Sequence, residues 1–250
     1  MDKMDIFSRN EMFWGEDAQK KLAESHVAVF GLGGVGGFCA EALARAGVGK
    51  LTIVDFDTVS ESNINRQVIA LTSTVGKSKV ELFNTRLKDI NPDLIINPID
   101  DFYNQKLNEQ LIDLNIDFVA DAIDSMRSKI DLLEFAYVNK IPVITSMGAG
   151  NRVNPEELYI SDISEIKNKN APFVSSVLYQ LKKRGIESGI TSVSSLEKPY
   201  CLEKISIVEN VSTLSGENIE FKKVIPSSTP FVASASGLFM ASYIVRKIIS

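Results

Sequence analysis

A glycine-rich turn between two apolar runs near the N-terminus constrains this sequence most. Residues 27–30 are VAVF, a run of strand-forming residues, and GLGGVG follows at 31–36. Glycines permit a tight turn that brings the backbone close to a phosphate, and the helix predicted after the turn would present its first amides to the same anion. A second strand is predicted over 51–54, and it ends at Asp55, about where an acid contacts a ribose. This unit predicts a nucleotide site.

Strand and helix patterns alternate through the first 150 residues. After a helical lead-in over 7–25, helices are predicted after 76–79 and around 104–114 and 130–138, with strands over 94–99, 117–121 and 142–146. This alternation predicts a Rossmann-like α/β fold, an open and mostly parallel sheet with helices on both faces. We expect residues 1–150 to form the ATP-binding half and residues 151–250 a smaller, irregular substrate-side half of the same domain. In that second half, 171–185 is predicted as a helix, and 186–200, rich in Ser and Gly, is expected to include a mobile loop.

Composition narrows the class of protein. A net charge of -5 argues against binding nucleic acid over the whole surface, so an RNA partner requires a local basic patch. The two cysteines, with no CxxC pair, exclude a zinc ribbon and a disulfide framework, and a cytoplasmic location is expected. Residues 230–249 are long enough to span a bilayer, but their serines and glycine favour a buried helix over a membrane anchor.

Polar and charged residues gather where the predicted strands end. Carboxyl ends of parallel strands share one edge of a sheet, so these residues are expected to meet there. Cations with a facing carboxylate suit a triphosphate with Mg²⁺ better than a dinucleotide, because an acid beside phosphates is repulsive unless a divalent ion lies between them. The chemistry predicted is attack by a nucleophile on the α-phosphate. The candidate nucleotide-binding residues are Gly31, Gly33, Gly34, Gly36, Asp55, Asp57, Asn63, Asn65, Arg66, Gln67, Lys79, Asp121, Asp124 and Ser125.

Structural roles remain open for several of these residues. Arg66 and Lys79 are equally interpretable as solvated surface charges, and Asp121 or Asp124 as a cap for the helix that follows. His26 precedes the first strand, at the opposite end from the site, and is expected to be structural. Cys39 is expected in the core. Cys201 lies in a polar segment, where a nucleophilic role is the less favoured alternative.

Five ordered motifs resemble the nucleotide site of the ubiquitin-activating-like superfamily, which includes ThiF, MoeB and HesA. They are GLGGVG at 31–36, DFD at 55–57, SNINRQ at 62–67, GKSK at 76–79 and DAIDS at 121–125. The resemblance implies ATP and Mg²⁺ as cofactors and a homodimer in which Arg9 crosses to the partner's site. It implies Gly33 and Gly34 at the phosphates, Asp55 at the ribose, Asn65, Arg66 and Lys79 on the phosphate chain, and Asp124 on Mg²⁺. Arg9, Arg66, Lys79 and Asp124 are thus the implied catalytic residues.

Within this superfamily the chain most resembles the tRNA threonylcarbamoyladenosine dehydratases. The segments that carry this are FSRNEMFWGEDA at 7–18, IPVITSMGAG at 141–150 and SVSSLEKP at 192–199. The resemblance implies ATP-dependent activation of the threonine carboxylate of a modified adenosine next to the tRNA anticodon, followed by cyclisation with loss of water. Two features depart from it: Ile6 stands where many members carry a basic residue, and no cysteine lies near 191–195, which argues against an obligatory thioester.

Two other functions compete with this interpretation. The same ATP site would serve an adenylating enzyme for a ubiquitin-like sulfur-carrier protein, although the absent zinc cysteines argue against it. A non-catalytic scaffold that keeps the fold is disfavoured by the presence of Arg66, Lys79 and Asp124 together. A tRNA partner is expected to contact a basic cluster, for which a solvated face is the alternative, formed by Lys167, Lys169, Lys182, Lys183 and Arg184.

Overall fold

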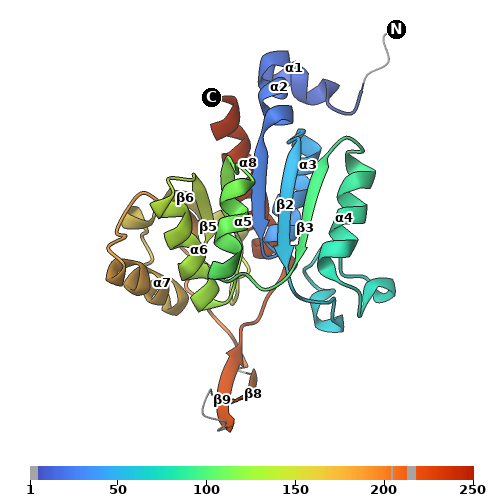
Figure 1. The fold of residues 1–250 in the computed structure, drawn as a ribbon. Coiled ribbons are helices and arrows are strands. Elements are labelled where there is room, and N and C mark those ends of the chain that lie inside the picture. Colours follow the sequence, from blue (N-terminus) through green and yellow to red (C-terminus); the bar gives the residue numbers. More distant parts are fainter. Residues whose placement is uncertain (1–4, 204, 213–217) are drawn as a thin grey trace.

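A mostly parallel open sheet organises the molecule. The structure is a computed structural model that describes residues 5–203, 205–212 and 218–250, without the side chains of 113, 205–212 and 218–225. The sheet has seven strands in the order β3-β2-β1-β4-β5-β7-β6, all parallel except β6, which runs antiparallel to β7 (Figure 1). The fold class predicted from the sequence is thus confirmed. Its strands are β1 (His26–Phe30), β2 (Lys50–Asp55), β3 (Ile95–Asp100), β4 (Phe118–Asp121), β5 (Val143–Ser146), β6 (Leu158–Asp162) and β7 (Thr191–Ser195).

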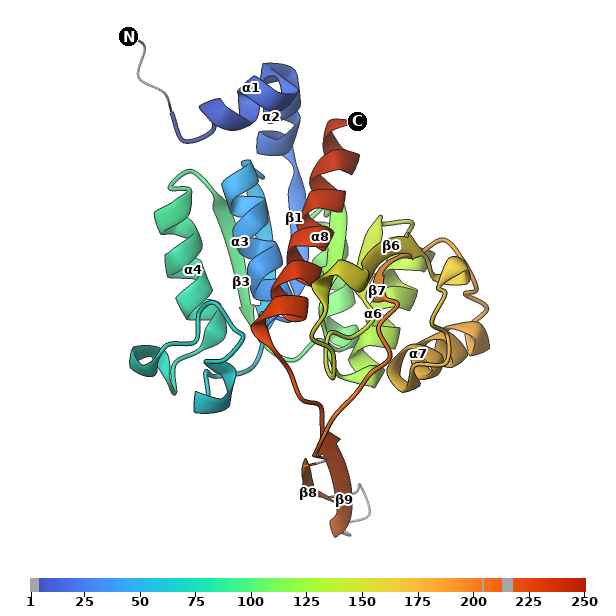
Figure 2. The ribbon, with the colours of Figure 1, turned by 180° about the vertical axis from the view of Figure 1, so that it is seen from behind.

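Helices cover both faces of this sheet, and each face has its own core. Successive residues of a strand point to opposite faces, so Val27 and Val29 enter one core while Ala28 and Phe30 enter the other. The first core is closed by three helices that lie in front in the view from behind (Figure 2), namely α3 (Gly36–Ala46), α4 (Lys79–Ile90) and α8 (Pro230–Ile249). The second core is closed by α5 (Asn108–Asp113), α6 (Met126–Val138) and α7 (Pro172–Lys183).

The predicted helical lead-in is divided in two. Gly15 adopts a positive φ of 86° and separates α1 (Ser8–Trp14) from α2 (Glu16–Glu24). Leu22 of α2 is fully buried, whereas Phe13 of α1 is 86% exposed. Short 3₁₀ turns connect other elements, namely η1 (Glu61–Asn63), η2 (Thr72–Thr74), η3 (Gln105–Leu107), η4 (Pro155–Glu157) and η5 (Ile163–Glu165).

The mobile loop predicted within 186–200 does not include the central part of that segment. Residues 191–195 form β7, which lies between β5 and β6 inside the sheet. Ser192 is fully buried there, and its hydroxyl donates to the carbonyl oxygen of Ser161 on β6 at 3.1 Å. A serine-rich segment has the composition of a loop, so the sequence pattern misses this strand. Burial of the Ser192 hydroxyl is possible because it is hydrogen-bonded to the neighbouring strand.

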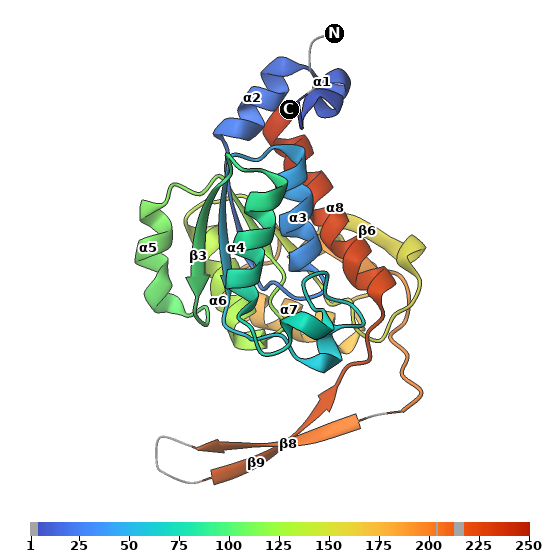
Figure 3. The same cartoon turned by 90° about the vertical axis from the view of Figure 1, so that its right-hand side faces the viewer.

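An antiparallel hairpin projects from the sheet and was not predicted. Its strands are β8 (Ile205–Ser212) and β9 (Asn218–Ile225), which pair only with each other. The hairpin extends from the end of the molecule opposite to α1 and α2 (Figures 1 and 3). This is the end at which β1, β2, β4 and β5 finish.

The C-terminal helix α8 packs against α3, as its small residues predict. A Cβ on Gly237 would lie 2.2 Å from the carbonyl oxygen of Val35, so only glycine permits this approach of the two helices. Met240, Ala241 and Ile244 enter the core beneath the sheet. By length and hydropathy α8 would also reach across a bilayer, but 44% of its most apolar window is buried inside the protein. The contacts are those of a core helix.

Candidate functional site

A cavity of about 960 Å³ opens where β1, β2, β4 and β5 end. In an open α/β sheet ligands bind outside the carboxyl ends of the strands, at the point where the strand order reverses, and here that point lies between β1 and β4. The cavity therefore has the position and the size of a nucleotide site. Of the candidates predicted from the sequence, the residues that line it are Gly31, Gly33, Gly34, Asp55, Asp57, Asn63, Arg66, Gln67, Lys79, Asp124 and Ser125.

Close backbone packing dictates the glycines of the turn. Gly31 has a positive φ of 85°, and a Cβ there would lie 2.8 Å from the carbonyl oxygen of Ala122. Gly36 does not line the cavity; a Cβ on it would lie 1.7 Å from the carbonyl oxygen of Gly31. Because α3 begins at Gly36 with no side-chain cap, the amides of its first turn remain available to an anion, except that of Gly37, which donates to the carbonyl oxygen of Gly33 at 3.1 Å.

Asp55 braces this turn from the end of β2. One carboxylate oxygen accepts the backbone N–H of Leu32 at 2.6 Å and the other accepts that of Asp57 at 2.8 Å. Burial raises the pKa of Asp55, against the opposing effect of Lys79. If Asp55 contacts a ribose, as predicted from the sequence, it must do so through carboxylate oxygens that already accept hydrogen bonds from backbone N–H groups.

Lys79 begins α4 and is almost fully buried. Its ammonium lies 2.7 Å from Asp57 and 3.6 Å from Asp55. The lysine charge is therefore largely balanced by two carboxylates of the cavity wall, of which the Asp57 side chain is 48% exposed. A solvated surface charge, the alternative left open by the sequence, does not describe a side chain that is 4% exposed.

Arg66 is the second cation of this wall, and it makes no ion pair with a carboxylate in the part of the chain that the structure describes. Its Nη1 donates to the carbonyl oxygen of Ser62 at 2.7 Å and to the Asn65 side chain at 2.9 Å. Burial lowers its pKa, and Asp124 opposes that effect. Asn65 itself does not line the cavity, because its amide donates to Ser228 and its oxygen holds Arg66. It orients the guanidinium.

Two further amides of the SNINRQ segment have different surroundings. Asn63 caps η1, since its side-chain oxygen accepts the N–H of Ser60 at 3.1 Å. Gln67 is buried, and its side-chain oxygen has no hydrogen-bond partner among the described residues. An unpartnered acceptor in a cavity wall is costly unless a ligand or water donates to it.

Asp121 and Asp124, three residues apart, lie in opposite environments. Asp121 is fully buried and does not line the cavity, because Lys129 approaches one of its oxygens at 2.5 Å and Thr145 donates to the same oxygen at 2.6 Å. The predicted contact of Asp121 with the nucleotide is therefore replaced by a supporting role: its other oxygen accepts the N–H of Ile123 at 3.0 Å and fixes the loop that carries Asp124. Asp124 is exposed in the cavity wall and forms no ion pair with a described residue.

Arg9 lies far from this cavity within one chain. It is exposed on α1, at the end of the sheet where the strands begin (Figure 1). A catalytic role for Arg9 consequently requires a second copy of the chain.

Several cavity residues were missed in the sequence analysis. Phe56 and Phe102 follow β2 and β3, and their rings meet edge to face at 5.0 Å between centroids, which offers an apolar wall for a base. Arg152 follows β5 through the GAGN turn and is only 7% exposed. The sequence carried no clear signal for these residues, because Arg152 stands six residues after β5 in a polar turn and aromatic residues after strands are common in cores.

The predicted basic cluster is partly neutralised. Arg184 pairs with Asp131 at 2.7 Å and with Glu134 at 2.5 Å, and Lys182 pairs with Glu187 at 3.2 Å. Lys183 and Lys167 lie over the rings of Tyr179 and Tyr159. This leaves fewer unpaired cations for RNA than the sequence suggests.

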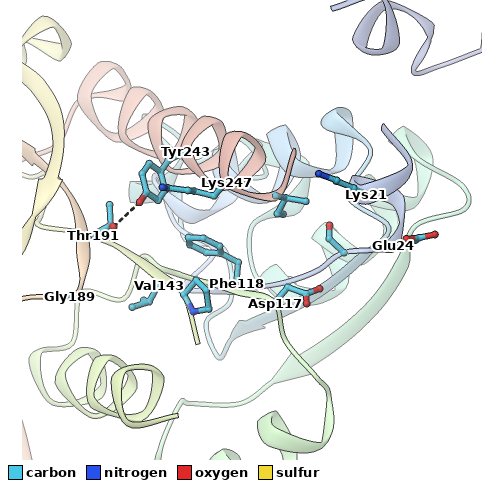
Figure 4. Close-up of a pocket in the computed structure, with 12 residues that line it drawn as sticks. Lys21, Glu24, Asp117, Phe118, Val143, Gly189, Thr191, Tyr243 and Lys247 are labelled. Atoms are coloured by element: carbon cyan, nitrogen blue, oxygen red, sulfur yellow. Dashed lines mark hydrogen bonds between the residues drawn. The ribbon is translucent and has the colours of Figure 1, made fainter. Parts of the chain in front are cut away.

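A second cavity of about 690 Å³ lies at the opposite edge, where β4, β5 and β7 begin (Figure 4). Lys21 and Lys247 reach it from α2 and α8, and the Tyr243 hydroxyl lies 3.0 Å from that of Thr191. Its wall contains none of the predicted site residues. His26 lies near this edge with both ring nitrogens bonded, at 2.9 Å to Leu114 and 2.8 Å to Thr52, which is the structural role expected from the sequence.

Comparison with known proteins decides the family. A model described as the ThiF family matches residues 7–182, which include the glycine turn, the Arg66 segment, Lys79 and Asp124. The chain belongs to the ThiF family. This agrees with the superfamily that the five motifs predict.

Among ThiF family proteins, the chain is similar over nearly its whole length to dehydratases. It is 42% identical to the tRNA threonylcarbamoyladenosine dehydratase of Bacillus subtilis, over 97% of this chain and 94% of that protein. The crystal structure of the Escherichia coli tRNA N6-threonylcarbamoyladenosine dehydratase matches with a TM-score of 0.82 and 29% identity, over 98% of this chain and 94% of that one. A crystal structure of the Escherichia coli protein in complex with ATP matches equally well.

Similarity to ThiF family enzymes for sulfur carriers is shorter. The molybdopterin-synthase adenylyltransferase of Escherichia coli is 38% identical over 52% of this chain and 51% of that protein. Within the described residues, no group of three or more Cys, His, Asp or Glu side chains could hold a metal ion on its own. The shorter match distinguishes this protein from the dehydratases, whose similarity covers nearly the whole chain.

Proposed function

We propose that this ThiF family protein is an ATP-dependent enzyme that dehydrates threonylcarbamoyladenosine next to the tRNA anticodon. The observation that carries the proposal is the 42% identity over 97% of the chain to a protein named for this reaction. The large cavity at the switch point of the sheet supports it, because it offers a glycine turn for phosphates and an unpaired Arg66. In this reaction the threonine carboxylate attacks the α-phosphorus of ATP and pyrophosphate leaves.

The second step needs no protein nucleophile. A carbamoyl atom of the same nucleoside attacks the activated carbonyl carbon, a proton is lost to solvent, and AMP leaves with one oxygen of the original carboxylate. Because the two groups belong to one molecule, proximity supplies much of the rate. This agrees with a cavity whose wall contains neither the single histidine nor either cysteine.

We assign the nucleotide-binding roles as the family resemblance implies. Gly33, Gly34 and the first amides of α3 would hold phosphates, with Arg66 and Lys79 on the β and γ groups, where one such donor is typically worth about 3–4 kcal/mol. Asn65 would act through Arg66, which it orients. Asp55 would reach the ribose, and the Phe56 and Phe102 rings would flank the base.

Asp124 suits Mg²⁺ that arrives with the nucleotide. Magnesium usually keeps several waters and binds one or two carboxylates together with substrate phosphates. Asp124 offers an exposed carboxylate without a cation partner in the described chain, whereas Asp57 is already shared with Lys79. Bound Mg²⁺ would neutralise phosphate charge and favour departure of pyrophosphate.

We further propose a homodimer in which Arg9 of one copy approaches the cavity of the other, and a cytoplasmic location. The position of Arg9 at the far end of its own sheet is compatible with a role only across an interface. A sulfur-transfer or carrier protein remains a proposed additional partner.

Mass spectrometry of digested tRNA tests the proposed function. Purified protein is incubated with ATP, Mg²⁺ and tRNA that carries threonylcarbamoyladenosine, and the nucleosides are separated by liquid chromatography. We expect that nucleoside to lose the mass of one water only when ATP is present. No mass loss, together with ATP–pyrophosphate exchange stimulated by a small ubiquitin-like protein, would instead support the sulfur-carrier alternative.

A further inference from the structure

Arg152 is a buried cation in the cavity wall that the assigned nucleotide roles do not use. It is 7% exposed and follows the GAGN turn after β5. By strand order the glycine turn follows β1, Asp124 follows β4 and Arg152 follows β5, so Arg152 lies beyond Asp124 as seen from the glycine turn. Adjacent strands are about 4.8 Å apart, so the end of β5 is two strand spacings from the end of β1, where the glycine turn begins.

The guanidinium of Arg152 is held only by backbone carbonyls. Its Nη1 donates to those of Gly148 and Gly150, and its Nε donates to that of Glu197 at 3.3 Å. The Glu197 carboxylate does not pair with it, because it accepts the amides of Val153 and Asn154 at 2.9–3.1 Å. Nη2 donates to no residue in the described part of the chain.

This arrangement leaves a positive charge without a directly paired carboxylate, among the described residues, in a largely desolvated position. Burial lowers the pKa of Arg152, with Glu197 opposing it, which is the direction expected when the charged form is deprived of water. A buried guanidinium without a carboxylate is costly, and an anion that enters the cavity removes that cost. Lys79 differs, since Asp55 and Asp57 already balance its charge.

We propose that Arg152 binds the carboxylate of the substrate, the threonine carboxylate of the modified adenosine. This inference rests on the proposed function. Nη2 would donate to one carboxylate oxygen and leave the other free to attack the α-phosphorus, while Nη1 and Nε keep the guanidinium fixed on the 148–150 turn. Recognition by a buried charge also provides specificity, because unmodified adenosine carries no carboxylate and would leave Arg152 unpaired.

The test compares two anticodon stem–loop RNAs that differ only in the modification, one with threonylcarbamoyladenosine and one with adenosine. Binding is measured by fluorescence anisotropy with Mg²⁺ and α,β-methylene-ATP, which cannot be split at the α-phosphorus. We expect the unaltered protein to prefer the modified RNA by about tenfold or more, and Arg152→Gln to bind both RNAs alike. Its affinity for the nucleotide should not change.

Three results would overturn the proposal. Arg152→Gln with the full preference would show that Arg152 does not read the carboxylate. An equal loss of affinity for both RNAs would indicate a contact to the phosphate backbone, and a loss of nucleotide affinity would place Arg152 in the ATP site. In all three cases the unaltered protein still dehydrates its substrate, whereas failure of the proposed function removes dehydration and preference together.

Two further variants control for folding and for charge. Arg152→Lys keeps the charge but has no second terminal nitrogen, so we expect it to fold and to lose at least about threefold of the preference. Retention of the whole preference by Arg152→Lys would also contradict the proposal. Lys198→Gln removes an exposed cation one residue after Glu197 and should leave the preference unchanged.

Discussion

The ends of β2 and β4 use the same residue types in opposite ways. Each strand ends in an aspartate, Asp55 or Asp121, and a second aspartate follows within three residues. At β2 a single lysine, Lys79, is shared between both acids and stays in the cavity wall. At β4 the lysine is Lys129, which forms an ion pair with the first acid, Asp121, and neither side chain is exposed. The second acid, Asp124, therefore lies in the cavity wall without an ion-pair partner among the described residues.

The buried ion pair at β4 has a structural role, whereas the acids and the lysine at β2 belong to the proposed nucleotide site. The sealed pair at β4 fixes the loop through Asp121 and Ile123, and it leaves Asp124 available to a cation. Lys79 at β2 would place a positive charge beside the phosphates of a bound nucleotide, but Asp55 and Asp57 already balance much of that charge. Substitutions at the two ends should therefore affect stability and activity in different proportions.

The largest effect is expected for Lys129→Met. Removal of the lysine leaves Asp121 charged, buried and unpaired, and breaking a buried pair in this way typically costs about 3–5 kcal/mol. Urea denaturation measures the free energy of unfolding. Asp121→Asn combined with Lys129→Met should be more stable than Lys129→Met alone, and a double variant that is less stable would contradict the pairing.

Asp124→Asn should abolish most of the activity without affecting the fold. Loss of one electrostatic contact made in the transition state lowers rates by about 100- to 1000-fold. AMP release measures the rate, and thermal unfolding should be unchanged because Asp124 is exposed. Asp101→Asn, an exposed acid of the same cavity, is the matched control and should keep most of the activity. Equal losses for both variants would remove the special role of Asp124.

Lys79→Gln is expected to lower activity less than Asp124→Asn and stability less than Lys129→Met. Because Asp55 and Asp57 already share its charge, Lys79 should contribute less than a free donor, about the 1.5–3 kcal/mol of a hydrogen bond to a charged group, so AMP release should fall about 10- to 100-fold. The cost in stability should stay near 1 kcal/mol, because Asp57 can turn to water. A stability loss as large as that of Lys129→Met would show that the two lysines have the same role.

The smallest effect concerns His26 at the amino end of β1, a buried titratable side chain that forms no ion pair with any residue that the structure describes. Burial lowers its pKa in the folded protein, so its contribution to stability is complete above the unfolded pKa of about 6.5 and is lost as the pH falls below that value. Unfolding by urea between pH 8 and pH 5 should show this loss, and His26→Gln should reduce it. An identical pH dependence in His26→Gln would assign it to other groups.

The sequence predicts the first half of this fold well because hydrophobic periodicity and turn residues agree there. It fails at β7, whose buried serines, such as Ser192 with its hydrogen bond to the carbonyl oxygen of Ser161 on β6, have the composition of a loop, and at the β8–β9 hairpin. The sequence also assigns the same role to Asp121 and Asp124. Only the structure shows that Lys129 of α6 forms a buried ion pair with Asp121 and not with Asp124. Arg152 was missed because its importance depends on burial, which a polar GAGNR segment does not indicate.

The most direct test of the central proposal, adenylation of a carboxylate, follows an oxygen atom. RNA with ¹⁸O in the threonine carboxylate is incubated with the protein, ATP and Mg²⁺, and the nucleotide products are analysed by mass spectrometry. Attack on the α-phosphorus followed by ring closure predicts AMP that carries one ¹⁸O, together with unlabelled pyrophosphate. Formation of ADP with ¹⁸O in inorganic phosphate would show attack on the γ-phosphorus and contradict the proposed reaction.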